Sequence, residues 1–196
     1  MESKKKMKQS LSIIFDKTKI LDPTKGEYIL FKSLWENNTK PLLLINWLRR
    51  FGWSLCRLGA YELTSTLNEA SEEIKNKLNW IAIGLAKLDY ENFVKDDYFK
   101  NGLIYLDEKK ETYKSLNFTS MGLFSGFGML NPKVYLKSYE ASKKGISGNL
   151  QGDGTQLGGL IIVNSSGEVI FSHVQKNYTD QPDINEIIKI IENYNS

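Results

Sequence analysis

The only cysteine of this 196-residue chain lies among all three of its arginines. Residues 49–57, called the arginine–cysteine loop below, read Arg-Arg-Phe-Gly-Trp-Ser-Leu-Cys-Arg. The nucleophilic form of cysteine is the thiolate, which nearby cations and the N–H groups at a helix start both favour. Burial of the Cys56 sulfur would instead favour the protonated thiol. The loop therefore predicts thiol redox chemistry, and the sequence leaves the balance between these two effects open.

A thiol that works alone has a restricted reaction cycle. The chain has one cysteine, so oxidised Cys56 must stop as a sulfenic acid or be released by an external thiol. The alternative interpretation is an unreactive thiol packed as a small hydrophobe. Ser54 is expected to cap the helix that follows. A nucleophilic Ser54 would need a base, and the single histidine, His173, lies in a predicted strand of unknown proximity.

The elements that must position the loop follow from the apolar patterns. A near-continuous apolar run at 41–48 predicts a strand covered on both faces, and the spacing over 54–78 predicts a helix. We expect further strands at 11–15, 28–35 (with a helical turn), 79–84, 102–107, 160–164 and 168–174, and helices at 88–95, 108–116, 131–144 and 183–194. Crossover helices imply parallel strands, and the late hairpin adds antiparallel ones. This order indicates a thioredoxin-like α/β fold, with a mixed central sheet and helices on both faces.

Composition narrows the class of protein further. Hydrophobic residues make up 41% and charged residues 25%, as in a soluble globular chain, and we expect one domain over 10–196. Residues 1–9 read as a flexible basic tail whose lysines account for the net charge of +3, and nucleic-acid binding is not expected. No apolar stretch approaches the ~20 residues that span a bilayer. The lone cysteine suits a reducing compartment, so we expect a cytoplasmic protein without a transmembrane segment.

A glycine-rich segment at residues 145–159 holds six of the fifteen glycines. It lacks the Gly-Lys-Ser/Thr end of a phosphate-binding loop, so nucleotide binding is not expected. We expect Gly158 and Gly159 to lie beside Cys56 and to offer free backbone groups to an extended ligand; the alternative is a surface loop. Asp153 reads as a turn-stabilising residue. No group of His, Cys, Asp or Glu has metal-ligand spacing, so no metal site is predicted.

Several motifs together resemble the peroxiredoxin-like 2 family, the AhpC/TSA-type group that includes prostamide/prostaglandin F synthase. They are Trp35, the arginine–cysteine loop, Asp97-Tyr98-Phe99, Tyr105-Leu106-Asp107-Glu108, Tyr113-Lys114, the run Gly145 to Asp153, Gly158-Gly159-Leu160 and His173-Val174-Gln175-Lys176. The resemblance covers roughly residues 26–191. It implies a thioredoxin fold and, in active members, a Cys-x-x-Cys pair. The first cysteine attacks an endoperoxide or disulfide, and the second resolves the product. It implies no bound cofactor; NADPH supplies the reducing equivalents through a thioredoxin system.

This chain departs from that pattern at the attacking cysteine. The pair reads Trp53-Ser54-Leu55-Cys56, so the resemblance leaves Cys56 at the resolving position and Trp53 at the attacking one. Peroxiredoxins themselves place a proline and a threonine where this chain has Arg49 and Trp53, and an arginine where it has Gly158. Both supports of peroxide chemistry are therefore absent from the sequence.

Two functional hypotheses remain. The first is a weak one-cysteine thiol oxidoreductase that resembles prostamide/prostaglandin F synthase, uses Cys56 and draws on a thioredoxin-like reductant. The second is a non-catalytic thioredoxin-like binding or structural subunit of a larger protein assembly. Trp53 is interpreted either as a partner-binding anchor or as a loop-tip aromatic stacked on an arginine. The candidate binding residues are Arg49, Arg50, Trp53, Ser54, Arg57, Gly158 and Gly159.

Overall fold

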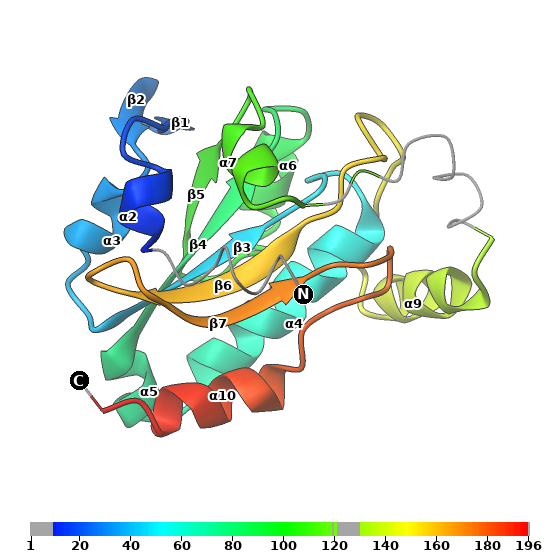
Figure 1. Cartoon of the computed structure of the whole chain (residues 1–196). Coiled ribbons are helices and arrows are strands. Elements are labelled where there is room, and N and C mark those ends of the chain that lie inside the picture. The colour runs from blue at the N-terminus through cyan, green and yellow to red at the C-terminus, as the bar shows by residue number, and fades with distance from the viewer. Residues whose placement is uncertain (1–9, 119, 121–129, 196) are drawn as a thin grey trace.

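A seven-stranded mixed sheet forms the centre of the molecule, as the computed structural model of residues 10–118, 120 and 130–195 shows (Figure 1). The tail predicted at 1–9, and most of the segment between 118 and 130 that the sequence left unassigned, lie outside these residues. Among the described residues, no helix is long and apolar enough to cross a membrane.

The strands are ordered β2-β1-β5-β4-β3-β6-β7 across the sheet. Strand β3 pairs in parallel with β4, and β4 in parallel with β5, whereas the remaining neighbours are antiparallel. Their bounds are β1 Lys19–Asp22, β2 Glu27–Leu30, β3 Leu42–Trp47, β4 Leu78–Gly84, β5 Leu103–Leu106, β6 Gly159–Asn164 and β7 Val169–Val174.

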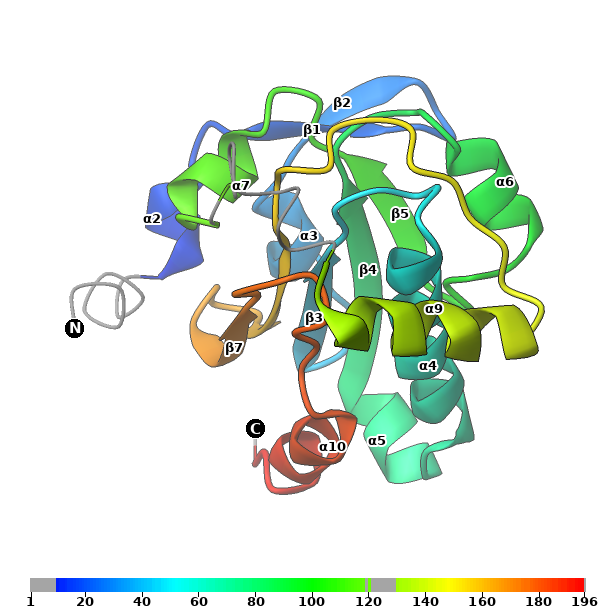
Figure 2. The same cartoon turned by 90° about the vertical axis from the view of Figure 1, so that its right-hand side faces the viewer.

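Helices cover both faces of this sheet, as predicted. Helices α4, α5 and α10 lie along one face, and α2, α3 and α7 lie on the other (Figures 1 and 2). The bounds are α2 Leu11–Ile14, α3 Ser33–Glu36, α4 Ser54–Glu69, α5 Glu72–Lys77, α6 Tyr90–Lys95, α7 Glu111–Ser115, α9 Pro132–Lys143 and α10 Ile184–Glu192.

Strand β3 divides the core into two halves because successive side chains of a strand point to opposite faces. Leu42 and Leu44 are buried in the cluster that includes α4, α5 and α10. Leu43, Ile45 and Trp47 are buried in the cluster on the opposite face. Burial on both faces fixes β3 firmly, and the arginine–cysteine loop follows directly after it.

Two expectations about local structure were wrong, and one strand was not foreseen. The strand expected at 11–15 is instead the helix Leu11–Ile14: Ser10 caps its start, and Leu11 and the C-cap residue Phe15 are both buried. Strand β1 was not foreseen; it pairs with β2 and β5. The helical pattern at 54–78 is two helices, because Ser71 caps a new helix by accepting a hydrogen bond from the backbone N–H of Ile74.

Candidate functional site

Cys56 lies in the first turn of α4, just beyond the carboxyl end of β3, and its side chain is half-buried. The N–H groups of a first helical turn carry partial positive charge towards such a side chain. The backbone N–H of Arg57 closes this turn on the Trp53 carbonyl at 3.0 Å. Trp53, not Ser54, is the N-cap residue, and it makes no side-chain capping bond. The predicted capping role of Ser54 is therefore wrong; Ser54 is the first residue of the helix.

The guanidinium of Arg49 is buried beside the thiol. Arg49 is only 3% exposed and interacts with Cys56, and its Nε has no hydrogen-bond partner. Burial lowers the pKa of Arg49, while the Cys56 sulfur acts in the opposite direction and the neighbouring Arg50 cation adds to the lowering. Among the described residues, no carboxylate lies within ion-pair distance of Arg49. The Cys56 thiol and the Tyr178 phenol are therefore the ionisable acids that this buried cation meets.

Trp53 packs against the Arg49 guanidinium. Its ring is 3% exposed, with the Arg49 guanidinium carbon 3.5 Å from its centroid and the Tyr178 ring edge-on at 5.4 Å. Arg49 also lies 4.3 Å from the centroid of Tyr178, so the cation is held between two aromatic rings. Leu55, Val134 and Leu157 complete this small apolar cluster, against which Cys56 packs. The stacking on an arginine is present, but the buried ring leaves almost no surface for a partner.

Arg50 ties the loop to the glycine-rich segment. Its Nη1 donates to the carbonyl oxygens of Leu150, Gln151 and Gly152, at 2.6, 3.4 and 3.3 Å. The Arg50 guanidinium carbon lies 5.7 Å from the centroid of Trp53, farther than that of Arg49. Arg50 therefore holds a neighbouring segment in place, and the structure gives it no contact with Cys56.

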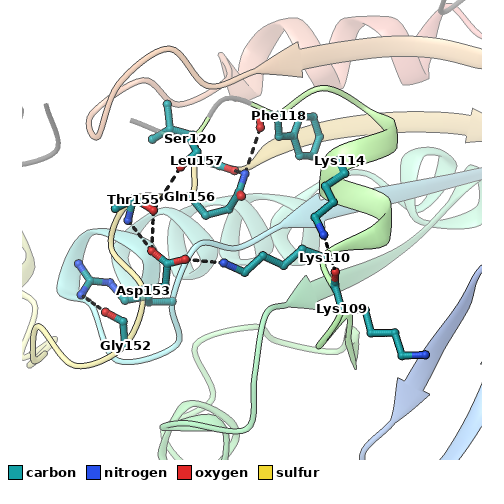
Figure 3. Close-up of polar contacts among 11 residues, drawn as sticks. Lys109, Lys110, Lys114, Phe118, Ser120, Gly152, Asp153, Thr155, Gln156 and Leu157 are labelled. Atoms are coloured by element: carbon teal, nitrogen blue, oxygen red, sulfur yellow. Dashed lines mark hydrogen bonds and ion pairs between the residues drawn. The ribbon is translucent and has the colours of Figure 1, made fainter. Parts of the chain in front are cut away.

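Asp153 anchors the same segment on its other side (Figure 3). Its carboxylate forms an ion pair with Lys110, just before α7, and accepts hydrogen bonds from the backbone N–H and hydroxyl of Thr155 at 2.9 and 2.7 Å. Partial burial raises the pKa of Asp153, but the Lys110 and Thr155 bonds outweigh it and bring the pKa down to about 2. Asp153 therefore stabilises its own turn, as expected, and also links the glycine-rich segment to the start of α7.

Arg57 and Asn149 form a second link between the loop and the glycine-rich segment. Arg57 is buried and donates from Nε to the Phe51 carbonyl at 2.7 Å and from Nη1 to the Ser147 carbonyl at 2.9 Å. The backbone N–H of Asn149 donates to the Gly52 carbonyl at 2.7 Å, and its side-chain amide donates to Asp89. That hydrogen bond lowers the pKa of Asp89. Asn149 of the Gly148-Asn149 motif therefore holds the arginine–cysteine loop against the glycine-rich segment.

Gly158 and Gly159 do not provide the free backbone groups that the sequence predicted. The N–H of Gly158 donates to Gln175 Oε1 at 3.0 Å, and its carbonyl accepts from the Gln175 N–H at 3.1 Å. Gly159 is paired within the sheet to Trp47 and Val174. A Cβ atom on Gly158 would lie 1.9 Å from the Trp47 carbonyl oxygen. Gly158 is therefore required by close packing between strands, not by an open ligand site.

His173 does not act on Ser54. It lies on β7, where its Nε2 is 3.1 Å from Asp180 Oδ1 without the alignment of a hydrogen bond. Among the residues the structure describes, no contact joins His173 to Ser54, and no group of three or more His, Cys, Asp or Glu side chains is placed to hold a metal ion.

Three residues of the site were missed by sequence reasoning: Tyr178, Lys110 and Asp89. Each reaches the loop or the glycine-rich segment from a distant part of the chain. None carries a local signal, since an isolated Tyr, Lys or Asp is ordinary surface composition. Gly148 differs from these three residues, because a glycine in a sequence can mark a close approach of two backbones. A Cβ atom at this position would lie 2.4 Å from the Ser54 backbone nitrogen.

The sheet order, the helices on both faces and a thiol at the helix start after a central strand define a thioredoxin-like protein of the peroxiredoxin type. Solved structures have the same fold. A thiol peroxidase from Chromobacterium violaceum aligns with a TM-score of 0.59 at 13% identity, covering 89% of this chain and 82% of that one. A peroxiredoxin-like protein from Aquifex aeolicus aligns at 0.58 and 8% identity, over 89% and 81%.

The chain belongs to the AhpC/TSA antioxidant enzyme family, whose model matches residues 64–177. Curated relatives share more of the sequence. Prostamide/prostaglandin F synthase of Xenopus tropicalis is 33% identical over 85% of this chain and 80% of its own length. The human protein of that name is 32% identical over 85% and 81%. The family-model match begins beyond Cys56 and does not include the arginine–cysteine loop.

Proposed function

We propose that this protein is a one-cysteine thiol oxidoreductase in which Cys56 is the nucleophile. The observation that carries this proposal is Arg49, a buried cation with no carboxylate partner among the described residues, placed beside the sulfur. Burying an unpaired charge costs free energy, and a negative charge that forms on the neighbouring sulfur offsets that cost. The first turn of α4 adds partial positive charge from the other side.

The reaction has three displacement steps on sulfur, and Cys56 takes part in the first two. The Cys56 thiolate attacks one sulfur of a disulfide; the Cys56 S–S bond forms as the substrate S–S bond breaks, and the leaving thiolate takes a proton. An external thiol then attacks the substrate sulfur of the mixed disulfide, which regenerates the Cys56 thiolate and leaves the external thiol joined to that half of the substrate. A second external thiol displaces this half as a thiol, and the two external thiols end as a disulfide. The external thiols supply both electrons. The external thiols are necessary because the attacking position of the family pair is occupied by Trp53.

An endoperoxide is the second substrate class, suggested by the names of the curated relatives. Attack on one oxygen breaks the O–O bond and forms a Cys56 S–O bond, and the alkoxide takes a proton. One external thiol then displaces the alcohol from sulfur, and a second releases Cys56. We propose a thioredoxin-like dithiol as this reductant, with NADPH as its electron source outside the protein and no cofactor bound to the chain.

The test is the reactivity of Cys56 in the folded protein. We expect iodoacetamide to label Cys56 without denaturant. We also expect NADPH consumption when the protein, thioredoxin, thioredoxin reductase and a disulfide or endoperoxide substrate are combined. Cys56→Ser is the matched control and should abolish both signals. Labelling that occurs only in denaturant would rule the oxidoreductase out.

A non-catalytic binding subunit is the second candidate, because Trp53 occupies the attacking position and leaves Cys56 without a second cysteine. Since the Trp53 ring is buried, a partner would bind to another surface. The Trp53–Tyr178–Arg49 stack keeps the loop rigid in a form that needs no redox turnover. Native mass measurement of the protein purified from its own cells distinguishes the two. A defined complex that persists in Cys56→Ser supports the binding subunit, and a free monomer contradicts it.

A further inference from the structure

Helix α9 presents an apolar outer face that nothing in the described structure covers. Tyr135, Leu136 and Tyr139 are 63%, 68% and 61% exposed, and their three- and four-residue spacing places them on one side of the helix. Val134 and Ala141 are the buried residues of α9 and lie on its inner side. Figure 2 shows α9 lying across the outside of the molecule, where it contacts α4.

The same helix and its end are basic. Residues 132–144 include one acidic residue, Glu140, and four lysines, at positions 133, 137, 143 and 144. Lys137 is ion-paired with Glu140, and Lys144 with Glu62 and Glu140. Lys133 and Lys143 make no ion pair with any described residue, and the Lys143 Nζ lies 4.7 Å from the centroid of Tyr139. The exposed tyrosines and leucine are thus bordered by positive charge at both ends of the helix.

We propose that this face of α9 docks on an anionic lipid surface. Leu136 and the tyrosine rings suit the boundary between headgroups and acyl chains, while lysine ammonium groups meet headgroup phosphates and carboxylates. A second copy of this chain fits less well. Two α9 helices packed face to face bring Lys133 or Lys143 of one copy against a lysine of the other in either direction, and like charges repel. The proposal is independent of the chemistry at Cys56.

Tyr139→Trp provides a direct reporter of docking. The four natural tryptophans are all buried, at most 8% exposed, so a new indole on α9 dominates any environmental change. We expect its emission to shift to the blue with vesicles of phosphatidylcholine plus phosphatidylserine, and to return when the salt concentration is raised. Phosphatidylcholine vesicles alone should produce no shift. Tyr28→Trp, at a 54% exposed position on β2, is the matched control and should not respond.

Co-sedimentation with the same vesicles measures the strength of binding. Leu136→Glu, and separately Lys133→Glu with Lys143→Glu, should each weaken binding by about tenfold or more, given the contribution of each lysine near an anionic surface. Ile13→Glu, at a 70% exposed position on α2, should leave binding unchanged. Circular dichroism of each variant verifies the fold.

Three results would overturn the proposal. The first is a wild-type protein that does not sediment with the anionic vesicles. The second is binding that survives the α9 variants but is lost when Lys4, Lys5, Lys6 and Lys8 are changed to serine, which would assign it to the N-terminal lysines. The third is a wild-type dimer that Leu136→Glu converts to a monomer, which would assign the face to a second copy.

Discussion

Arg49 distinguishes the surroundings of Cys56 from those of an ordinary buried thiol. The sequence placed the two residues seven positions apart, and the structure brings the guanidinium to the sulfur. Between them the chain bends at Phe51 and Gly52, and Arg49 stacks over the buried indole of Trp53. The charge beside Cys56 is therefore a product of the loop's packing and not of its composition alone.

Arg49→Met should slow the alkylation of folded Cys56 by about tenfold at pH 7. A tenfold change corresponds to about 1.4 kcal/mol, which is in the range expected for one charge a few ångströms from the reacting atom. The measurement is the second-order rate with iodoacetamide. Lys114→Met, an exposed cation on α7, is the matched control. An Arg49→Met protein that reacts as fast as the wild type would show that the guanidinium does not act on the sulfur.

Trp53→Cys, which restores the family's pair of cysteines, should destabilise the fold by about 3 kcal/mol. The indole is buried against Arg49 and Tyr178, and removing a buried Trp leaves a cavity and an Arg49 cation that has lost one of its two rings. Urea unfolding under reducing conditions measures the loss. Tyr139→Cys, at an exposed position, should change stability by less than about 0.5 kcal/mol. Equal effects of the two variants would contradict the packing role of Trp53.

At the scale of elements, the glycine-rich segment is a clamp. It reaches the arginine–cysteine loop through Arg50 and Asn149, and it reaches the start of α7 through Asp153 (Figure 3). The tyrosine of α7, Tyr113, donates its hydroxyl hydrogen to the Leu48 carbonyl at 2.6 Å, and burial raises its pKa well above the ordinary value. These contacts hold both sides of the loop, so the site is preorganised.

Asp153→Asn should cost about 1 kcal/mol of stability at pH 7. The carboxyl has a pKa of about 2 in the folded protein, below the ~3.9 of an unfolded Asp, so its contribution is fully present above about pH 4. It is lost as the pH falls through about 2. The full linkage value is larger, but both partners are about one-third exposed, and solvent screening reduces it. Urea unfolding at pH 7 and at pH 2.5 should show the gap between variant and wild type narrowing. A gap that is independent of pH would contradict the ion pair.

Gly158→Ala should destabilise the protein by more than about 2 kcal/mol, because its Cβ would overlap the Trp47 carbonyl in a rigid sheet. Gly59→Ala is the matched control. There the Cβ meets only the flexible side chain of Gln181, and alanine improves helix propensity by up to about 1 kcal/mol. Thermal or urea unfolding compares the two. A tolerated alanine at 158 would reopen the interpretation of this glycine as part of a ligand site.

At the scale of the whole molecule, the centre of the sheet carries the stability. Strands β3, β4 and β6 are paired on both sides and buried almost throughout, whereas β2 and β7 are edge strands with exposed or half-buried side chains. Both hydrophobic clusters meet on β3, so the loop that follows it starts from the most constrained strand of the fold.

Native-state hydrogen exchange should reflect this arrangement. We expect the amides of β3, β4 and β6 to exchange only through global unfolding, and those of β2 and β7 through smaller openings with lower free energy. The amide of Trp53, which leads into α4, should exchange faster than those of β3. Uniform protection across all seven strands would contradict a stability gradient from the centre to the edges.

The sequence by itself determined the fold class, the strand–loop–helix around Cys56 and the resemblance to the family. Its two periodicities and its turn residues are local signals, and they sufficed for β3, the start of α4, α9 and the late hairpin. They failed at 11–15, where five residues with four apolar side chains suit a strand or a helical turn equally well. They also failed at β1, whose four residues are too short to show a pattern.

Only the tertiary structure decided what surrounds the thiol. It assigned Arg49 to the sulfur, Arg50, Arg57 and Asn149 to the clamp, and Gly158 to close packing of strands. It also brought in Tyr178, more than a hundred residues along the chain, to hold the Arg49 cation. Such assignments depend on which distant side chains meet after the chain has folded. The spacing of residues in the sequence does not predict these contacts, because they form only when separate helices and strands pack together.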